Sequence, residues 1–250
     1  MSDELPFFIT GSEQKGPWLI TCDHACNRIP EAINGGSLGL PDFEMHRHIA
    51  YDVGAKGLSL ALGKHLQSPV LCSNFSRLVI DPNRGEDDPT LLMKVYDGTL
   101  IPANRNANSA EVKRRLMAYH RPYHKAYGEL ATSDRAIVAV HSFTPQLKGR
   151  PPRPWEIGIL FAQDRRLANP TIAGLQARGD LNVGINEPYD GHLHGDSIDQ
   201  HALRNDRLNI LIEVRNDLIE NTEGQEGWAE LLAPILQQAL AATNEAKAGE

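Results

Sequence analysis

Two histidines, His24 and His141, stand close behind runs of strand-forming apolar residues at 18–22 and 136–140. In an open α/β sheet the carboxyl ends of neighbouring strands meet at the ligand crevice, so we expect these two imidazoles to lie close together. A third apolar run leads to a carboxylate, Glu213. Imidazoles and a carboxylate hold Zn²⁺, and a carboxylate that is not a ligand can deprotonate the bound water. The pattern therefore predicts a metal-assisted hydrolase.

The third metal ligand has two candidates. Asp52 lies in a segment whose apolar spacing predicts a helix over 49–66, which could present the carboxylate to the end of the sheet or to solvent. Asp23 is adjacent to His24 in sequence, but neighbouring side chains on an extended chain point to opposite faces. The sequence leaves the choice between the two carboxylates open.

Asn83 and Arg84 end a polar turn that follows the predicted strand 77–81. A planar guanidinium and an amide suit a substrate carboxylate, because together they offer a two-pronged fork and a further donor. The alternative is that Asp81 and Asn83 only shape a proline-containing turn. The two roles are compatible.

Further histidines could contribute to a site. His120 and His124 have the i, i+4 spacing of helical zinc motifs, but Arg121 stands where the general-base glutamate would be, so we expect a structural or substrate-contacting role for His124. His201 is a candidate for substrate binding by polarising a carbonyl. His46 and His48 could also be metal ligands, but each alone is expected at the surface.

Glu213 lies inside a predicted strand, where an acidic group is costly unless it is paired, hydrogen-bonded or near a cation. Arg215 shares its face two residues on, and is a candidate for a structural ion pair with Glu213 or for binding substrate. Beside a metal, Glu213 would instead act as general base toward water and then as acid toward the leaving nitrogen.

Strand-like and helix-like segments alternate along the chain, which predicts an α/β fold. We expect three α/β/α layers with a mixed, mainly parallel sheet, of the phosphorylase/hydrolase-like kind, in a single domain over 1–250. Strands are predicted at 18–22, 69–73, 77–81, 135–141, 156–162, 182–185 and 207–214. Beside the helix at 49–66, helices are predicted from a capping box at Asn108, with a kink or break at Pro122, from 169 to before Gly179, and over 228–242.

Composition excludes several classes of function. A formal charge of −7 argues against a nucleic-acid partner, since phosphate neutralisation needs a basic face. No run approaches the roughly 18 apolar residues of a membrane span, and residues 1–5 lack the basic start of a signal peptide, so we expect a cytoplasmic protein with no membrane partner. Three cysteines form no CxxC motif. The chain is compatible with a homo-oligomer.

Six segments together resemble the N-formylglutamate amidohydrolase family. They are Cys22-Asp-His-Ala-Cys-Asn-Arg-Ile-Pro30, Tyr51-Asp-Val-Gly-Ala55, Ser76-Arg-Leu-Val-Ile-Asp-Pro-Asn-Arg84, Tyr119-His-Arg-Pro-Tyr-His124, His141-Ser142 and Ile212-Glu-Val-Arg-Asn-Asp-Leu-Ile219. The resemblance implies a fold similar to zinc carboxypeptidases, with the following roles: His24, Asp52 and His141 on a divalent metal, Zn²⁺ by analogy, Asn83 and Arg84 on the substrate carboxylate, and Glu213 as base. The carboxypeptidase pattern has glutamate three residues after its first histidine, where this chain has Asn27.

These observations predict a metal-dependent amidohydrolase that cleaves a small-molecule N-acyl amino acid. N-formyl-L-glutamate, which would yield formate and L-glutamate, is the substrate that the resemblance implies. One alternative is a deacylase or peptidase for another N-acyl amino acid or small peptide. A second is a binding protein that holds a carboxylate ligand without turnover; Glu213 argues against it, because binding alone would need only Asn83 and Arg84.

Overall fold

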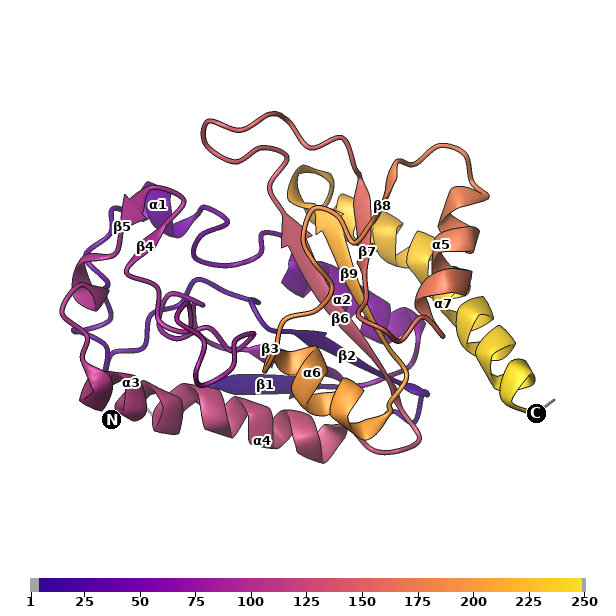
Figure 1. Ribbon diagram of the computed structural model, residues 1–250, viewed down its shortest axis with the longest axis horizontal. Coiled ribbons are helices and arrows are strands. Elements are labelled where there is room, and N and C mark those ends of the chain that lie inside the picture. The colour runs from indigo at the N-terminus through magenta and orange to yellow at the C-terminus, as the bar shows by residue number, and fades with distance from the viewer. Residues whose placement is uncertain (1–4, 249–250) are drawn as a thin grey trace.

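The computed structural model describes residues 5–248 and has a mixed seven-stranded sheet at its centre (Figure 1). In spatial order the strands are β1 (Phe7–Thr10), β3 (Val70–Ser73), β2 (Trp18–Cys22), β6 (Ala136–Phe143), β9 (Asn209–Arg215), β7 (Ile157–Leu160) and β8 (Val183–Ile185). β3, β2, β6 and β9 run parallel, whereas β1 and the pair β7–β8 run against them. Every residue of β2, β3 and β6 is buried, as expected for strands covered on both faces.

Helices cover both faces of the sheet (Figure 1). The helices on one face are α2 (Ala55–His65), α5 (Ala168–Gln176) and α7 (Thr222–Ala248), whose apolar residues share one core cluster with the sheet. On the other face, α4 (Arg121–Leu130) and the short α6 (Ser197–His201) pack over a second cluster. The predicted three-layer α/β/α fold with a mainly parallel sheet is therefore confirmed.

A smaller lobe of loops stands beside the sheet and has its own apolar cluster. Its short elements are α1 (Asp42–Met45), β4 (Val95–Tyr96), β5 (Thr99–Leu100) and α3 (Ser109–Arg115). Figure 1 shows α1, β4 and β5 together at the end of the molecule away from α5 and α7. The lobe and the sheet thus form two walls that can enclose a site.

One predicted strand, 77–81, is wrong. The segment turns back on itself: the Val79 N–H donates to the Ser76 carbonyl at 2.9 Å, and the Asp81 N–H bonds the Leu91 carbonyl at 2.8 Å. Its apolar residues pack into the cluster of the small lobe instead of the sheet. Apolar runs in a sheet and in a buried turn look alike in sequence, since both reflect burial only. Conversely, the half-exposed strand β1, at one edge of the sheet, was not predicted.

The helix predictions hold with shifted bounds. The Asn108 side chain accepts the Glu111 N–H at 3.1 Å, so the predicted cap of α3 is confirmed. A π-helical turn, Leu116–His120, joins α3 to α4. Pro122 lies in the first turn of α4, where proline is tolerated, so the helix does not break at Pro122 as predicted. α7 is longer than the predicted 228–242. Within the described residues, no helix has the length and hydropathy to cross a membrane. The expectation that there is no signal peptide depends mostly on residues 1–4, which lie outside the described residues.

Candidate metal centre and catalytic cleft

The sheet brings His24 and His141 together, as the strand pattern predicted. β2 and β6 are parallel neighbours, and the two imidazole centroids lie 5.0 Å apart. His24 follows the end of β2, but His141 lies inside β6, which continues to Phe143, instead of after it. Because side chains alternate along a strand, His141 shares the face of Ile137 and Ala139, which pack toward α4 and α6.

Asp52 reaches the two histidines from a loop, not from the predicted helix over 49–66. α2 begins only at Ala55, after Gly54, whose φ of 80° lies in the left-handed region. A Cβ at Gly54 would lie 2.1 Å from the Ile219 carbonyl oxygen, so only glycine fits this turn. The Asp52 N–H in turn donates to the His24 carbonyl at 2.9 Å, which ties the loop to the end of β2.

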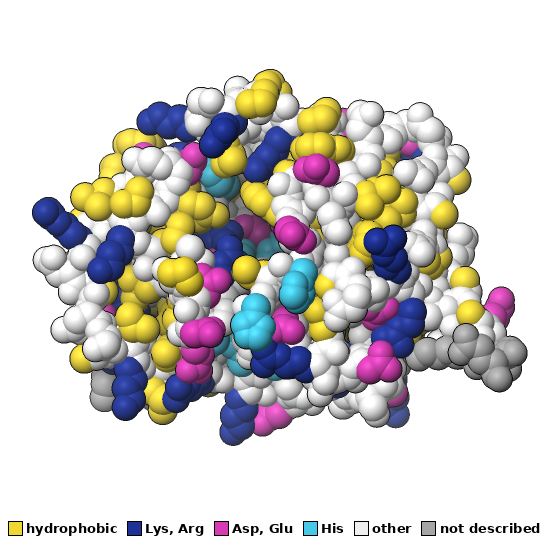
Figure 2. Space-filling view, viewed as in Figure 1, with side chains coloured by type: hydrophobic (Ala, Val, Ile, Leu, Met, Phe, Trp, Pro, Cys, Tyr) yellow, Lys and Arg dark blue, Asp and Glu magenta, His cyan; other side chains and the backbone are white. Residues whose placement is uncertain are grey.

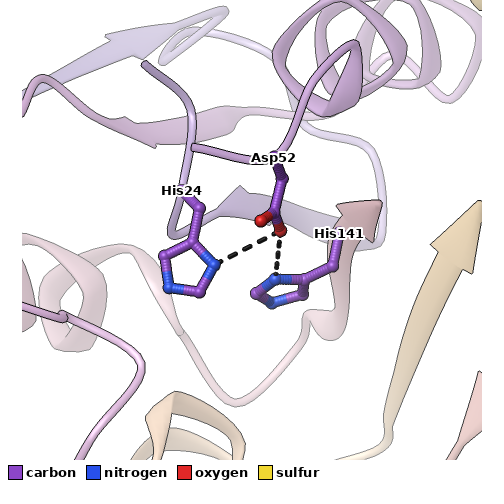
Figure 3. Close-up of side chains that lie close together, drawn as sticks. All are labelled: His24, Asp52 and His141. Atoms are coloured by element: carbon purple, nitrogen blue, oxygen red, sulfur yellow. Dashed lines mark hydrogen bonds and ion pairs between the residues drawn. The ribbon is translucent and has the colours of Figure 1, made fainter. Parts of the chain in front are cut away.

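Figure 3 shows the Asp52 carboxylate pointing between the two imidazoles. Its Oδ2 lies 2.9 Å from Nδ1 of His141 and 3.3 Å from Nδ1 of His24. All three side chains are buried, and their three ligand atoms lie within 4.8 Å of one another. Two imidazole nitrogens and one carboxylate oxygen, with room for a further ligand, fit the donor set of a catalytic Zn²⁺ site.

Two more carboxylates lie behind the histidines. Asp81 Oδ1 is 2.7 Å from Nε2 of His24, and Asp23 Oδ2 is 3.6 Å from Nε2 of His141. Tyr123 donates its hydroxyl to the other oxygen of Asp23 at 2.5 Å. A carboxylate on the far nitrogen fixes the tautomer of a ligating histidine, leaving the lone pair of Nδ1 for the ligand. Asp23 thus sits behind His141, while Asp52 joins both imidazoles.

Arg77 neutralises part of this acidic cluster. Its guanidinium bonds Asp81 Oδ2 at 2.8 and 3.1 Å and lies 3.3 Å from Asp52 Oδ1. Burial would raise the pKa of Asp81, but the positive charges of Arg77, His24 and Arg84 together outweigh burial and hold that pKa well below its ordinary value. Sequence reasoning missed Arg77 and assigned Asp81 only to a turn. The signal present was an ion-pair spacing of four residues in a buried segment.

Glu213 stands beside His141 on the adjacent strand. The two Cα positions are paired across β6 and β9, and Gly158 of β7 is paired on the other side. Glu213 is 6% exposed and its Oε2 has no hydrogen-bond partner among the described residues. Burial raises the pKa of Glu213 to about 7. A poised, unpaired carboxylate next to candidate metal ligands is what a general base requires.

Arg215 is not the partner of Glu213, so that structural alternative is wrong. Its guanidinium bonds Asp217 at 2.8 Å and lies 3.4 Å from Glu156. β9 ends at Arg215, and the carboxylates of Asp217 and Glu156 that pair with this arginine lie nearer the surface than Glu213. The structure does not bring Arg215 into the cleft described next.

A cleft of about 270 Å³ opens in front of the candidate metal ligands and Glu213. Figure 2 shows a hollow near the middle of the visible face, with charged and histidine side chains in and around it. Asn83 and Arg84 line the cleft, where the Asn83 side chain accepts the Ser197 N–H at 3.2 Å. The Arg84 Nε donates to the Thr90 hydroxyl and its Nη1 to the Asn83 carbonyl, and no carboxylate forms an ion pair with Arg84 in the described part of the chain. A carboxylate ligand would meet an uncompensated guanidinium there.

His201 and His124 lie behind this loop, outside the cleft. His201 stacks on Tyr127 with centroids 4.1 Å apart, and its Nε2 lies 2.9 Å from Nδ1 of His124. His124 Nε2 in turn donates to the Pro82 carbonyl at 2.9 Å, and His120 Nε2 to the Arg84 carbonyl at 2.9 Å. The geometry gives His201 no access to a substrate carbonyl. These histidines instead support the backbone on both sides of Asn83.

Some residues of the cleft were not predicted at all. The loop between β8 and α6 crosses toward the cleft and contributes Tyr189, Asp190 and Asp196. Burial raises the pKa of Asp196 to about 6. His48, expected at the surface, also lines the cleft. The only sequence signal for this loop is its glycine-rich, polar composition, which marks loops in general.

Comparisons with known proteins agree with this architecture. A family model described as N-formylglutamate amidohydrolase matches residues 16–220. A solved gene product of Agrobacterium tumefaciens is 33% identical, with a TM-score of 0.90, and 96% of this chain and 97% of that one are covered. None of the curated proteins matches.

More distant solved structures share the fold. N-formylglutamate amidohydrolase from Ralstonia eutropha is 21% identical, with a TM-score of 0.63 and coverage of 99% and 100%. A bacteriophage poly-gamma-glutamate hydrolase is 10% identical, with a TM-score of 0.50 and coverage of 98% and 93%. At these identities the likeness extends to the fold alone.

Proposed function

Because this chain belongs to the N-formylglutamate amidohydrolase family, a family of hydrolases that act on amide C–N bonds, we propose that it is a metal-dependent enzyme for N-acyl amino acids. N-formyl-L-glutamate is the proposed substrate, with formate and L-glutamate as products. The observation that carries the proposal is Glu213, a buried carboxylate that stands beside the His24–Asp52–His141 cluster and whose Oε2 has no hydrogen-bond partner within residues 5–248.

His24, Asp52 and His141 would hold the metal, for which we propose Zn²⁺. When bound, a divalent cation supplies Lewis acidity, which polarises the acyl carbonyl and makes water easier to deprotonate. Asp81 is hydrogen-bonded to the far nitrogen of His24, and Asp23 faces the far nitrogen of His141 at 3.6 Å, which supports ligation through Nδ1.

Side chains of the protein would bind and orient the substrate and transfer the proton. Arg84 and Asn83 hold the substrate carboxylate at the wall of the cleft, so that the amide faces Glu213. Glu213 takes a proton from water at Oε2 while the water oxygen bonds to the acyl carbon, and returns the proton to the amide nitrogen as the C–N bond breaks. Formate and the amino acid with its free amino group are then the products, and Glu213 is again a carboxylate. A pKa near 7 suits both steps.

The alternative within the same chemistry is a deacylase or peptidase for another N-acyl amino acid or a small peptide. The fold is shared by enzymes with different substrates, so it does not decide between them. The metal, the base and the carboxylate-binding pair would be the same in every case. Only a substrate panel separates these possibilities.

The test combines metal analysis with a formate-release assay on protein purified without added ions. We expect about one Zn²⁺ per chain, and turnover of N-formyl-L-glutamate that chelation removes and Zn²⁺ restores. Glu213→Gln should keep the metal and lose activity. The matched change is Glu156→Gln, at the residue before β7, which should keep both the metal and the activity. Stoichiometric metal with tight carboxylate binding but no hydrolysis of any N-acyl amino acid would favour a binding protein.

A further inference from the structure

Arg153 is a cation held just behind the wall of the cleft. It lies in the loop between β6 and β7, and its Nη1 donates to the Thr144 carbonyl at 3.1 Å and to the Tyr189 hydroxyl at 3.2 Å. The guanidinium also stacks over two rings, 4.9 Å from the centroid of Tyr189 and 5.7 Å from that of Phe143. All three contacted residues line the cleft, although Arg153 itself stands just behind them.

The charge of Arg153 is uncompensated. The guanidinium of Arg77 is ion-paired with Asp52 and Asp81, so it offers little net charge to a ligand. Arg84 and Arg153, by contrast, have no carboxylate partner within the described part of the chain. Two guanidinium groups without a carboxylate partner among the described residues therefore lie in or beside the cleft: Arg84 lines it, and Arg153 stands behind Thr144 and Tyr189.

Tyr189 links the second of these groups to the catalytic region. Desolvation and the negative charge of Glu213 raise the pKa of Tyr189 to about 12, and the positive charge of Arg153 opposes them. Glu213 and Tyr189 both line the cleft, and the phenol of Tyr189 contacts Arg153 by a hydrogen bond and by stacking. A ligand that lies between Glu213 and Tyr189 would therefore approach the guanidinium from the side of Tyr189.

We propose that Arg153, with the Tyr189 hydroxyl, binds a second carboxylate of the substrate and selects amino acids with an acidic side chain. This inference rests on the proposed function, in which Arg84 takes the first carboxylate. Among the described residues, Nε and Nη2 of Arg153 have no acceptor, which leaves two parallel donors for a bidentate contact. Asp190 does not compete, because its carboxylate accepts the His192 N–H within its own loop.

The test compares kcat/KM for N-formyl-L-glutamate and N-formyl-L-glutamine, which differ in one charge. We expect the wild type to prefer the acid, and Arg153→Gln to lower kcat/KM for the acid about 10- to 100-fold while leaving the amide unchanged. Arg150→Gln is the matched control, since Arg150 is an exposed arginine of the same loop outside the cleft, and should leave both values unchanged. Equal loss for the two substrates, or no preference in the wild type, overturns the inference.

Binding separates failure of this inference from failure of the proposed function. If neither compound is hydrolysed, the proposed function is wrong, and calorimetry with L-glutamate and L-glutamine on the Zn²⁺-loaded protein decides the inference. Tighter binding of glutamate that Arg153→Gln removes supports it, and equal binding overturns it. Should Arg153→Gln lower the melting temperature, Arg153→Lys keeps the charge without the planar fork, and an intermediate loss for the acid alone is expected.

Discussion

Replacing Glu213 by glutamine should make the metal-free protein more stable while it abolishes turnover. Burial raises the pKa of Glu213 from an ordinary 4.5 to about 7, so the ionised side chain destabilises the folded state above neutral pH. A difference of about 2.5 pKa units corresponds to about 3 kcal/mol at 1.36 kcal/mol per unit, as an upper bound. Glutamine carries no charge and is nearly isosteric, so it removes this cost.

The pH dependence gives the prediction its sign. An acid whose pKa is raised on folding binds more protons in the folded state, so its unfavourable contribution is absent below about pH 4.5 and complete above about pH 7. The variant should therefore match the wild type near pH 4.5 and exceed it by up to about 3 kcal/mol at pH 8. For a chain of this length that is a rise of about 6–12 °C in Tm.

The assay is urea or thermal unfolding of chelator-treated wild type and Glu213→Gln at several pH values, with kcat measured on the same metal-reloaded preparations. Glu156→Gln is the matched control, because Glu156 is paired with Arg215 and partly exposed, and it should lose no more than about 1 kcal/mol with little pH dependence. A Glu213→Gln protein that is less stable at pH 8, or a difference that does not change with pH, would refute the reasoning.

Three further outcomes can be measured. Arg84→Lys should raise KM at least tenfold with a melting temperature within a few degrees of wild type, because the charge remains and the fork is lost; unchanged KM with a large loss of stability would make Arg84 a turn residue. Burial lowers the pKa of His124 to about 3, so as the pH falls the unfolded chain takes up a proton at this residue before the folded chain does. His124→Phe should therefore lower the slope of the free energy of unfolding against pH by up to about 1.4 kcal/mol per pH unit between pH 4 and 6.5. An unchanged slope contradicts this. Asp81→Asn should weaken Zn²⁺ binding about 10- to 100-fold by freeing Nε2 of His24, as measured by chelator competition, and undiminished affinity would show that the carboxylate has no such role.

The strands and the residues on them could be predicted because burial leaves a local mark. Each central strand is an apolar run, so the positions of His24, His141 and Glu213 relative to the sheet followed from the residues around them. That two of these strands would be neighbours, and so bring the imidazoles together, followed from the general behaviour of α/β sheets.

The loop residues could not be placed in this way. Asp52 reaches the histidines only because Gly54 turns the chain against Ile219, a contact between positions far apart in sequence. The choice between Asp52 and Asp23 therefore stayed open until the loop was placed. Likewise the segment after Ser76 reads as a strand, since its burial comes from the small lobe and no local pattern distinguishes that lobe from the sheet.

The reversed direction of β7 has a consequence for how this enzyme can change. Because β7 runs against β9, it begins at the edge of the sheet where β9 ends, and the loop before it borders the cleft through Thr144. That loop and the one between β8 and α6 hold none of the three candidate metal ligands. Insertions or substitutions there can reshape the cleft while the three candidate metal ligands and Glu213 stay in place. A library confined to these two segments is therefore the natural starting point for altering the proposed substrate specificity.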